Sequence, residues 1–227
     1  GFGMLRALIE AARHEGITDY PVHIKVDTGM HRLGFLPNEI PALVELFKQQ
    51  DALTPRSIFS HFAGSDSPLF DDFSKQQHAL FNTAAETLQQ AFGHKILRHI
   101  CNSAASVRFP QVHYDMIRLG IGMYGIGVNQ ETQKHLRYVH KLQSRLSEIR
   151  TIEKGEGVSY MRRFVAEKQS KIGVIPIGYA DGLNRHLSEK GFRVWINGKL
   201  APIIGSICMD MCMIDLSDIE AKVGDKV

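Results

Sequence analysis

The hydrophobic periodicity of the chain changes once, near its middle, and this change restricts the folds that it can adopt. Up to about Gly127, short β-rich runs alternate with longer runs of helical periodicity, which is typical of βα units around a parallel sheet. A doubly wound sheet and a TIM-type (β/α)8 barrel both use such units. Polar motifs follow several strands directly, and this favours a partial barrel, because barrel enzymes carry their chemistry at the carboxyl ends of strands. We expect helices at 2–15, 37–50 and 71–92, and strands at 21–27, 56–61, 96–101 and 114–118.

From about Tyr138 the helical periodicity ends, and extended segments follow one another between turns. Asn197-Gly198 separates two apolar runs and predicts a type I′ hairpin, because both residues accept positive φ angles. The polar stretch from 129 to 137 has neither periodicity. We therefore expect a partial α/β domain over 1–130 and an incomplete, mostly antiparallel β domain over 131–227. Its predicted strands are 139–152, 170–177, 191–197, 200–207 and 208–215.

Composition excludes several classes of function. The 227 residues carry a net charge of +3 that is spread along the sequence, with no basic cluster interleaved with aromatic residues. A nucleic-acid partner is therefore not expected, and no apolar run approaches the length of a membrane span. A small polar substrate is the better expectation. Both ends of the sequence fall within predicted elements, so we interpret the chain as part of a longer protein.

The three cysteines lie in apolar stretches, and their odd number argues against disulfides. Cys101, Cys208 and Cys212 are therefore predicted to be reduced thiols, which favours a cytoplasmic location. No further ligands near Cys208 and Cys212 complete a zinc site, so no metal is expected.

Two motifs with ionisable residues follow predicted strands in the first part. In the segment HIKVDTGMHRLGF, Lys25 and Asp27 alternate onto one face of a strand, and a Gly-rich turn then presents Arg32. A buried ion pair between Lys25 and Asp27 is the structural alternative to a functional site. In HFAGSD, His61 ends the next strand and is a base, a platform under a cofactor ring, or a satisfied core histidine. A role as metal ligand is the weakest alternative, because no companion ligands lie close by in the sequence.

Two further strand ends carry small residues suited to an anion. In CNSAA, Asn102 or Ser103 can cap the next helix, whose free N–H groups favour a phosphate. In MIRLGIGMYG, Arg118 precedes closely spaced glycines, and the N–H groups near Gly120 and Ile121 can approach a ligand. Caps without ligands are commoner than phosphate sites, so each signal is weak alone.

The β part presents two tyrosines among small residues. GVSY contains Tyr160, and IGYADG contains Tyr179. Turn tyrosines are usually packing residues with a hydrated hydroxyl. The last segment, ICMD, contains Met209 and Asp210 and alternates like a strand with an inward acid.

Taken in order, the motifs HIKVDTGMHRLGF, HFAGSD, CNSAA, MIRLGIGMYG, GVSY, IGYADG and ICMD closely resemble the alanine racemase family. The resemblance runs nearly from end to end. It implies an eight-stranded α/β barrel that binds pyridoxal 5'-phosphate, joined to a β domain. It also implies a head-to-tail homodimer with shared active sites, which interconverts L-alanine and D-alanine and supplies D-alanine for peptidoglycan.

The resemblance also assigns roles to single residues. His61 would lie beside the pyridine ring, Ser103 with the backbone at Gly120 and Ile121 would bind phosphate, and Asn102 would lie in the same shell. Arg32 and the partner's equivalent of Met209 would meet substrate. Lys25 matches a lysine that is carbamylated in some members, and it is given a supporting role with Tyr179 and Asp210. Small departures from the family pattern occur at His31, Met161 and Ser206.

Arg118 would face the ring nitrogen of the cofactor. A guanidinium donates hydrogen bonds but keeps its protons, so the ring nitrogen stays unprotonated. The ring is then a weaker electron sink, which favours reprotonation at Cα over transamination.

Racemisation requires an acid and a base on opposite faces of a planar intermediate. Tyr160 would be one of them, working at the partner's cofactor, although its phenol would need a lowered pKa for work near neutral pH. The other would be the lysine that holds the cofactor, whose motif is absent from this sequence. Two alternatives remain open: a basic amino-acid decarboxylase of the same superfamily, and an inactive fragment of a cofactor-binding barrel.

Overall fold

The computed structural model describes all residues from 1 to 227. The chain forms two compact units, Gly1–His140 and Lys141–Val227. Residues 131–140 belong to the first unit, whereas the sequence predicted that the second domain begins at residue 131. The short helix α5 (Gln130–Gln133) explains this, because the Gln133 side chain bonds back to the carbonyl of Gly125 and the N–H of Gly127.

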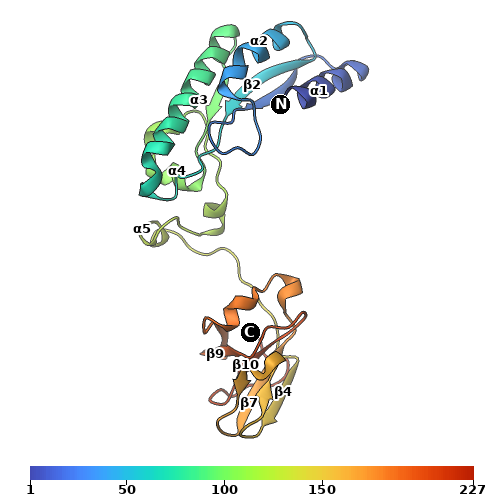
Figure 1. Cartoon of the computed structure of the whole chain (residues 1–227), viewed down its shortest axis with the longest axis vertical. Helices are drawn as coiled ribbons and strands as arrows, with labels where there is room; N and C mark the ends of the chain where they lie inside the picture. The colour runs from blue at the N-terminus through green and yellow to red at the C-terminus, as the bar shows by residue number, and fades with distance from the viewer. The chain divides into compact units, whose positions relative to one another are not determined.

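The first unit contains a three-stranded parallel sheet in the order β1–β2–β3, with helices between the strands (Figure 1). The predicted parallel βα arrangement is therefore confirmed. No helix of the chain is both long and apolar enough to span a membrane. The main elements are α1 (Phe2–His14), β1 (Tyr20–Lys25), α2 (Ile40–Lys48), β2 (Leu53–Phe59), α3 (Asp71–Ala91), β3 (Leu97–His99) and α4 (Ser103–Arg108).

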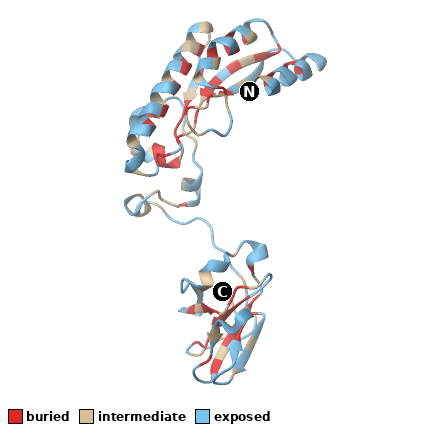
Figure 2. Ribbon diagram, viewed as in Figure 1, coloured by how far each residue is buried: buried red, intermediate tan, exposed pale blue.

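The two faces of this sheet differ in polarity. Ile24 and Ile58 are buried in one core with apolar residues of α1, α2 and α3 (Figure 2). Their strand neighbours alternate to the opposite face, where the register pairs His23 with Ser57, and Phe59 with both Lys25 and His99. The sheet thus has a helix-covered apolar face and a polar face, as a segment of an α/β barrel does.

The predicted strand at 114–118 is wrong. This segment runs beside β3 with only two backbone bonds, from Asp115 N–H to Arg98 O and from Arg118 N–H to Cys101 O. Tyr114 has a φ of 52°, which is incompatible with an extended strand. The segment therefore follows the sheet edge without forming a ladder, and it is flanked by the 3-10 turns η3 (Pro110–Val112) and η4 (Ile121–Tyr124).

The second unit contains a five-stranded antiparallel sheet in the order β4–β7–β10–β9–β8. The predicted hairpin is confirmed: Asn197 and Gly198 both have positive φ, and Ile196 pairs with Lys199. Its strands are β4 (Glu148–Ile152), β7 (Ser170–Ile175), β8 (Arg193–Ile196), β9 (Lys199–Ile204) and β10 (Cys212–Asp215), beside the small pair β5 (Gly157–Val158) and β6 (Phe164–Val165).

Two predicted strands of this unit are shorter than expected. Residues 139–147 contain only an isolated bridge between Arg145 and Lys226, so the strand begins at Glu148. Residues 208–211 form a turn closed by the Cys208 N–H and the Met211 carbonyl. The inward acid predicted there is also wrong, because Asp210 lies in this turn and is exposed.

Candidate functional site

The residues predicted to bind cofactor line one cavity in the first unit. This cavity has a volume of about 560 Å³ and lies where β2 and β3 end. It is bordered by polar side chains and by the loop that begins at Gly120. The predicted residues that line it are His61, Asn102, Ser103, Arg118, Gly120 and Ile121.

Arg118 is the most extensively bonded of these side chains. One guanidinium nitrogen donates to His99 Nδ1 at 2.7 Å and to the His99 carbonyl at 3.2 Å. The other donates to the carbonyl of Ser60 at 2.5 Å and lies 3.3 Å from His61 Nδ1. Its Cζ is 5.2 Å from the centre of the Phe59 ring. Arg118 is therefore held from several sides as a fixed donor at the strand ends.

The surroundings of His61 are electropositive. Burial lowers the pKa of His61, and the charges of Arg118, Arg32 and Lys25 lower it further. Burial, Arg32 and Arg118 similarly lower the pKa of Lys25, against a smaller opposite effect of Asp27. This side of the unit therefore keeps His61 neutral and favours an anionic ligand.

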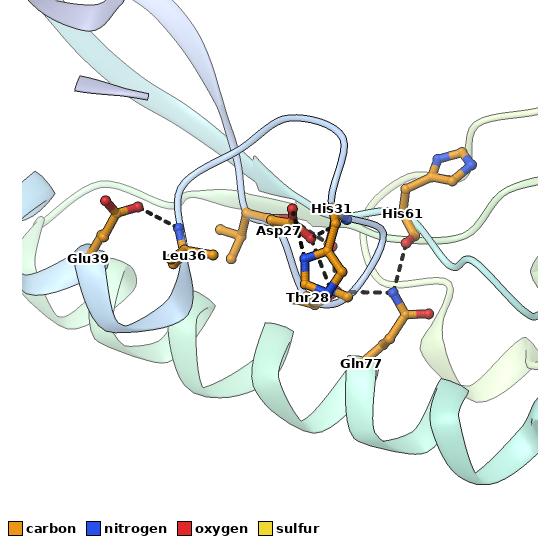
Figure 3. Close-up of polar contacts among 10 residues, drawn as sticks. Asp27, Thr28, His31, Leu36, Glu39, His61 and Gln77 are labelled. Atoms are coloured by element: carbon orange, nitrogen blue, oxygen red, sulfur yellow. Dashed lines mark hydrogen bonds and ion pairs between the residues drawn. The ribbon is translucent and has the colours of Figure 1, made fainter. Parts of the chain in front are cut away.

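The loop after β1 is organised by Asp27, whose Oδ1 accepts from the N–H groups of Gly29 and His31 at 3.0 Å each (Figure 3). Burial alone would raise the pKa of Asp27, but these backbone bonds lower it. No ion pair joins Lys25 and Asp27, so the predicted structural alternative is wrong. His31 has a φ of 52°, which explains why glycine suits this position.

The same loop is tied to α3 through Gln77, which is completely buried. Its Nε2 donates to the carbonyl of His61 at 3.1 Å and lies 3.4 Å from Thr28 Oγ1. The His61 ring points away from Gln77 (Figure 3). The backbone of His61 is therefore fixed from the helix side, while its imidazole lies on the other side, within reach of Arg118.

Ser103 joins the start of α4 to the glycine loop. Its Oγ accepts from the N–H of Gly120 at 2.9 Å and of Gly122 at 3.2 Å. The Ile121 N–H between them has no protein acceptor, and Ile121 is exposed. The serine thus shapes the loop as a cradle with an N–H available to a ligand.

Asn102 is the N-cap of α4, as predicted from its position after the strand. Its Oδ1 accepts from Ala105 N–H and from Ser65 Oγ, both at 2.9 Å, and its Nδ2 donates to Phe62 O at 3.3 Å. These contacts give Asn102 a positioning role at the cavity wall.

In the second unit, Tyr160 lies in a loop with unusual backbone conformation. Ser159, Met161 and Arg162 have φ angles of 64°, 58° and 49°, a left-handed region in which non-glycine residues are strained. Ser206 locks this loop: its carbonyl accepts from Ser159 Oγ at 2.7 Å, and its hydroxyl donates to the Tyr160 carbonyl at 3.3 Å. The Tyr160 side chain is 68% exposed, so the loop presents its phenol outward.

A second loop of this unit brings Tyr179 beside Met209. Their backbones touch, since Tyr179 N–H donates to Cys208 O and Ala180 N–H donates to Met209 O, both at 3.0 Å. Gly178 is required here, because a Cβ at this position would lie 2.1 Å from the Met209 carbonyl oxygen. Arg185 stacks 5.2 Å from the centre of the Tyr179 ring. Met209 remains 54% exposed.

Sequence reasoning missed His99 and Ser57, which are both buried. Each is a polar residue of a strand at a position on the polar face of the sheet, next to a buried isoleucine in the sequence. This alternation is a usable signal, although it does not show that His99 accepts a bond from Arg118. No group of three or more His, Cys, Asp or Glu side chains is arranged as a metal site.

Comparison with known proteins identifies both parts of the chain. The family model "Alanine racemase, N-terminal domain" matches residues 3–128, and "Alanine racemase, C-terminal domain" matches residues 139–227. Alanine racemase of Desulfovibrio desulfuricans is 41% identical over 225 residues, which cover 97% of this chain and 60% of that protein. Alanine racemase of Clostridium tetani is also 41% identical, over 91% of this chain and 54% of that protein.

Solved structures agree with the sequence comparison. The crystal structure of alanine racemase from D-cycloserine-producing Streptomyces lavendulae matches all of this chain with a TM-score of 0.90 at 31% identity, over 60% of its own length. The chain thus spans about 60% of the length of such relatives. With family models over both units and with this shared fold, the chain belongs to the alanine racemase family.

Proposed function

We propose that the full-length protein is a pyridoxal-phosphate-dependent racemase that interconverts L-alanine and D-alanine, and that this chain supplies its ring-binding and phosphate-binding residues together with one of its two bases. The bound cofactor would withdraw electrons from the substrate and make its Cα proton removable. The product D-alanine would serve peptidoglycan. The family membership of both units supports this proposal.

The residues present fit the cofactor chemically. A cavity of about 560 Å³ has room for an aromatic ring with a phosphate. The Ile121 N–H and Ser103 at the glycine loop would hold the phosphate, and the neutral His61 would lie beside the ring. Arg118 would donate a hydrogen bond to the ring nitrogen without giving up its proton. Arg32 and Lys25 would add positive charge for the phenolic oxygen and the substrate carboxylate.

Tyr160 would move the Cα proton on one face of the substrate. Its phenol is exposed on a strained loop and makes no hydrogen bond within its own unit, which supports a role at a site completed by another subunit. Met209 is also exposed and would meet the substrate at the same shared site. The assembly would then be a homodimer in which each subunit completes the other's site.

The observation that carries the proposal is the guanidinium of Arg118, fixed at the strand ends by His99 and Ser60. A decarboxylase of this superfamily would instead place a carboxylate there, to keep the ring nitrogen protonated. Neither His99 nor Ser60 carries a carboxylate. The racemase is therefore favoured over the decarboxylase.

The test uses full-length protein loaded with pyridoxal phosphate. Incubation with either enantiomer of alanine should produce the racemic mixture, and circular dichroism measures this change. In deuterated water, the Cα proton of alanine should exchange for deuterium. Carbon dioxide released from lysine or ornithine without racemisation of alanine would contradict the proposal. The chain of 227 residues alone should bind the cofactor non-covalently and show no turnover, because it has no counterpart of the cofactor lysine motif.

The thiols are consistent with the proposed cytoplasmic location. Burial raises the pKa of Cys101 and of Cys212 to about 11, so both remain protonated near neutral pH. Protonated, buried thiols react slowly with oxidants and partner thiols. These two cysteines therefore behave as packing residues.

A further inference from the structure

A continuous row of polar side chains crosses the polar face of the parallel sheet and ends at Arg118. Arg118 bonds His99 Nδ1 at 2.7 Å, and His99 Nε2 lies 3.1 Å from Ser57 Oγ. Ser57 Oγ is in turn hydrogen-bonded to His23 Nδ1. The four residues come from β1, β2, β3 and the segment after β3, so the row links all strands of the sheet.

Arg118 determines the direction of the first two bonds in this row. A guanidinium has only donors, so His99 Nδ1 must accept and carry no proton. Because burial and the Arg118 charge lower the pKa of His99 to about 4, the ring is neutral, and its single proton is on Nε2. That proton is donated to Ser57 Oγ, and the Ser57 hydroxyl can then donate to His23 Nδ1.

The residues of the row are packed so that their side chains have little freedom to move. His99 is 3% exposed and Ser57 is completely buried, so neither has water as an alternative partner. The His99 ring also stacks on Phe59, with ring centres 5.0 Å apart and planes within 3°. Packing therefore fixes the plane of the imidazole, Arg118 determines which nitrogen carries its proton, and Ser57 holds the protonated nitrogen in place.

We propose that Ser57 is a positioning residue: by bonding Nε2 of His99 it anchors the imidazole whose Nδ1 accepts from Arg118, and so holds the guanidinium as a fixed donor. The inference that this guanidinium serves the cofactor ring rests on the proposed function. The row of bonds itself stands independently of it.

The native protein tests the direction of the bonds directly. In cofactor-free, full-length protein with isotope-labelled histidine, two-bond proton–nitrogen correlation spectra distinguish protonated from unprotonated ring nitrogens. At about pH 8, His99 should carry its proton on Nε2. A His99 that is protonated on Nδ1 would overturn the proposal.

A pair of serine variants then tests the role of the hydroxyl. Ser57→Ala should make rotation of the Arg118 guanidinium about tenfold faster, the change expected from weakening one buried hydrogen bond. This rotation is measured by exchange between its terminal nitrogens in arginine-labelled protein. Ser74→Ala is the matched control, because Ser74 is equally buried but its hydroxyl has no partner. It should leave both the His99 tautomer and the rotation unchanged.

Ser57→Thr keeps the hydroxyl and should restore slow rotation. Unchanged rotation in Ser57→Ala, or equal changes in Ser57→Ala and Ser74→Ala, would show that Ser57 only fills space. Should the threonine variant fail to fold, the comparison of Ser57→Ala with Ser74→Ala still decides the case.

Addition of pyridoxal phosphate separates this inference from the proposed function. Binding should shift the Arg118 nitrogen resonances in the native protein. Absence of a shift on saturation would overturn the placement of Arg118 at the ring, while the rotation rates in Ser57→Ala and Ser74→Ala would still decide the positioning role of Ser57.

Discussion

Arg118 in the α/β unit and Tyr160 in the β unit are held in opposite ways. The Arg118 guanidinium is half-buried and contacts His99, Ser60 and His61 through its own nitrogens. The Tyr160 phenol is 68% exposed and has no hydrogen bond; only its backbone is fixed, by Ser206. One residue is positioned by its side-chain contacts, and the other by a strained loop. The difference teaches that the contacts that orient Arg118 are complete within the α/β unit, whereas no contact within the β unit orients the Tyr160 phenol.

The largest effect is expected from removing the Tyr160 hydroxyl. Tyr160→Phe in the full-length protein should slow racemisation by about a hundredfold to ten-thousandfold, because an acid–base group is lost. Cofactor binding should not change, since Tyr160 is placed by its backbone. Tyr138→Phe is the control, as Tyr138 is equally exposed at 68%. Polarimetry measures the rate of racemisation from each enantiomer of alanine. Full activity in Tyr160→Phe would contradict the proposed role of the Tyr160 phenol.

Gly178→Ala should damage the β unit while sparing the site around Arg118. The new Cβ would lie 2.1 Å from the Met209 carbonyl oxygen, so the two loops must separate. We expect a loss of about 3 kcal/mol in the free energy of unfolding of this unit. Trp195 is the only tryptophan and lies in β8, so its fluorescence in urea reports this unit alone.

Gly93→Ala is the control for that substitution, because a Cβ there meets nothing within 4 Å. It should leave the Trp195 transition unchanged. If Gly178→Ala were as stable as Gly93→Ala, the contact between the Tyr179 loop and Met209 would not be tight.

The bonded site of the α/β unit should be more sensitive to acid than the Tyr160 loop. The pKa of His99 is lowered from 6.5 to about 4, so between these values the unfolded chain binds more protons than the folded one. His99 therefore contributes stability that is present above pH 6.5 and lost as the pH falls towards 4. The full contribution is roughly 3 kcal/mol.

The loss of stability is checked by urea unfolding of the α/β unit at several pH values between 6.5 and 4. Far-ultraviolet circular dichroism detects the unfolding. His99→Gln should flatten the pH dependence. His14→Gln should not, because the His14 side chain is 86% exposed. An equally steep dependence in His99→Gln would mean that another group is responsible.

The smallest effects separate two loop-holding serines. Ser103→Ala leaves the N–H groups of Gly120 and Gly122 without their acceptor and should cost about 2 kcal/mol in unfolding free energy. Ser206→Ala removes one longer bond to the Tyr160 carbonyl and should cost less than about 1 kcal/mol. Chemical denaturation of both variants measures the difference, and the reverse order would contradict the view that the α/β site is the more tightly bonded.

Local signals were sufficient for much of the architecture. The Asn197-Gly198 turn and the Asn102 cap each depend on residues within a few positions of one another, so their physics can be read from adjacent side chains. The polar motifs that follow β2 and β3 lie at one cavity, because parallel strands end at the same edge of a sheet.

The network around Arg118 was decided by tertiary structure. Arg118 meets Ser60 across 58 positions and His99 across 19, and strand register determines which lone pair faces which proton. The same limit explains the errors at 114–118 and Asp210: an extended periodicity does not form a strand where backbone bonds to a neighbour are missing. Hydrogen-bond partners depend on distances of a few tenths of an ångström between remote segments. The order of side-chain types along the chain does not determine these distances, whereas the packed fold does.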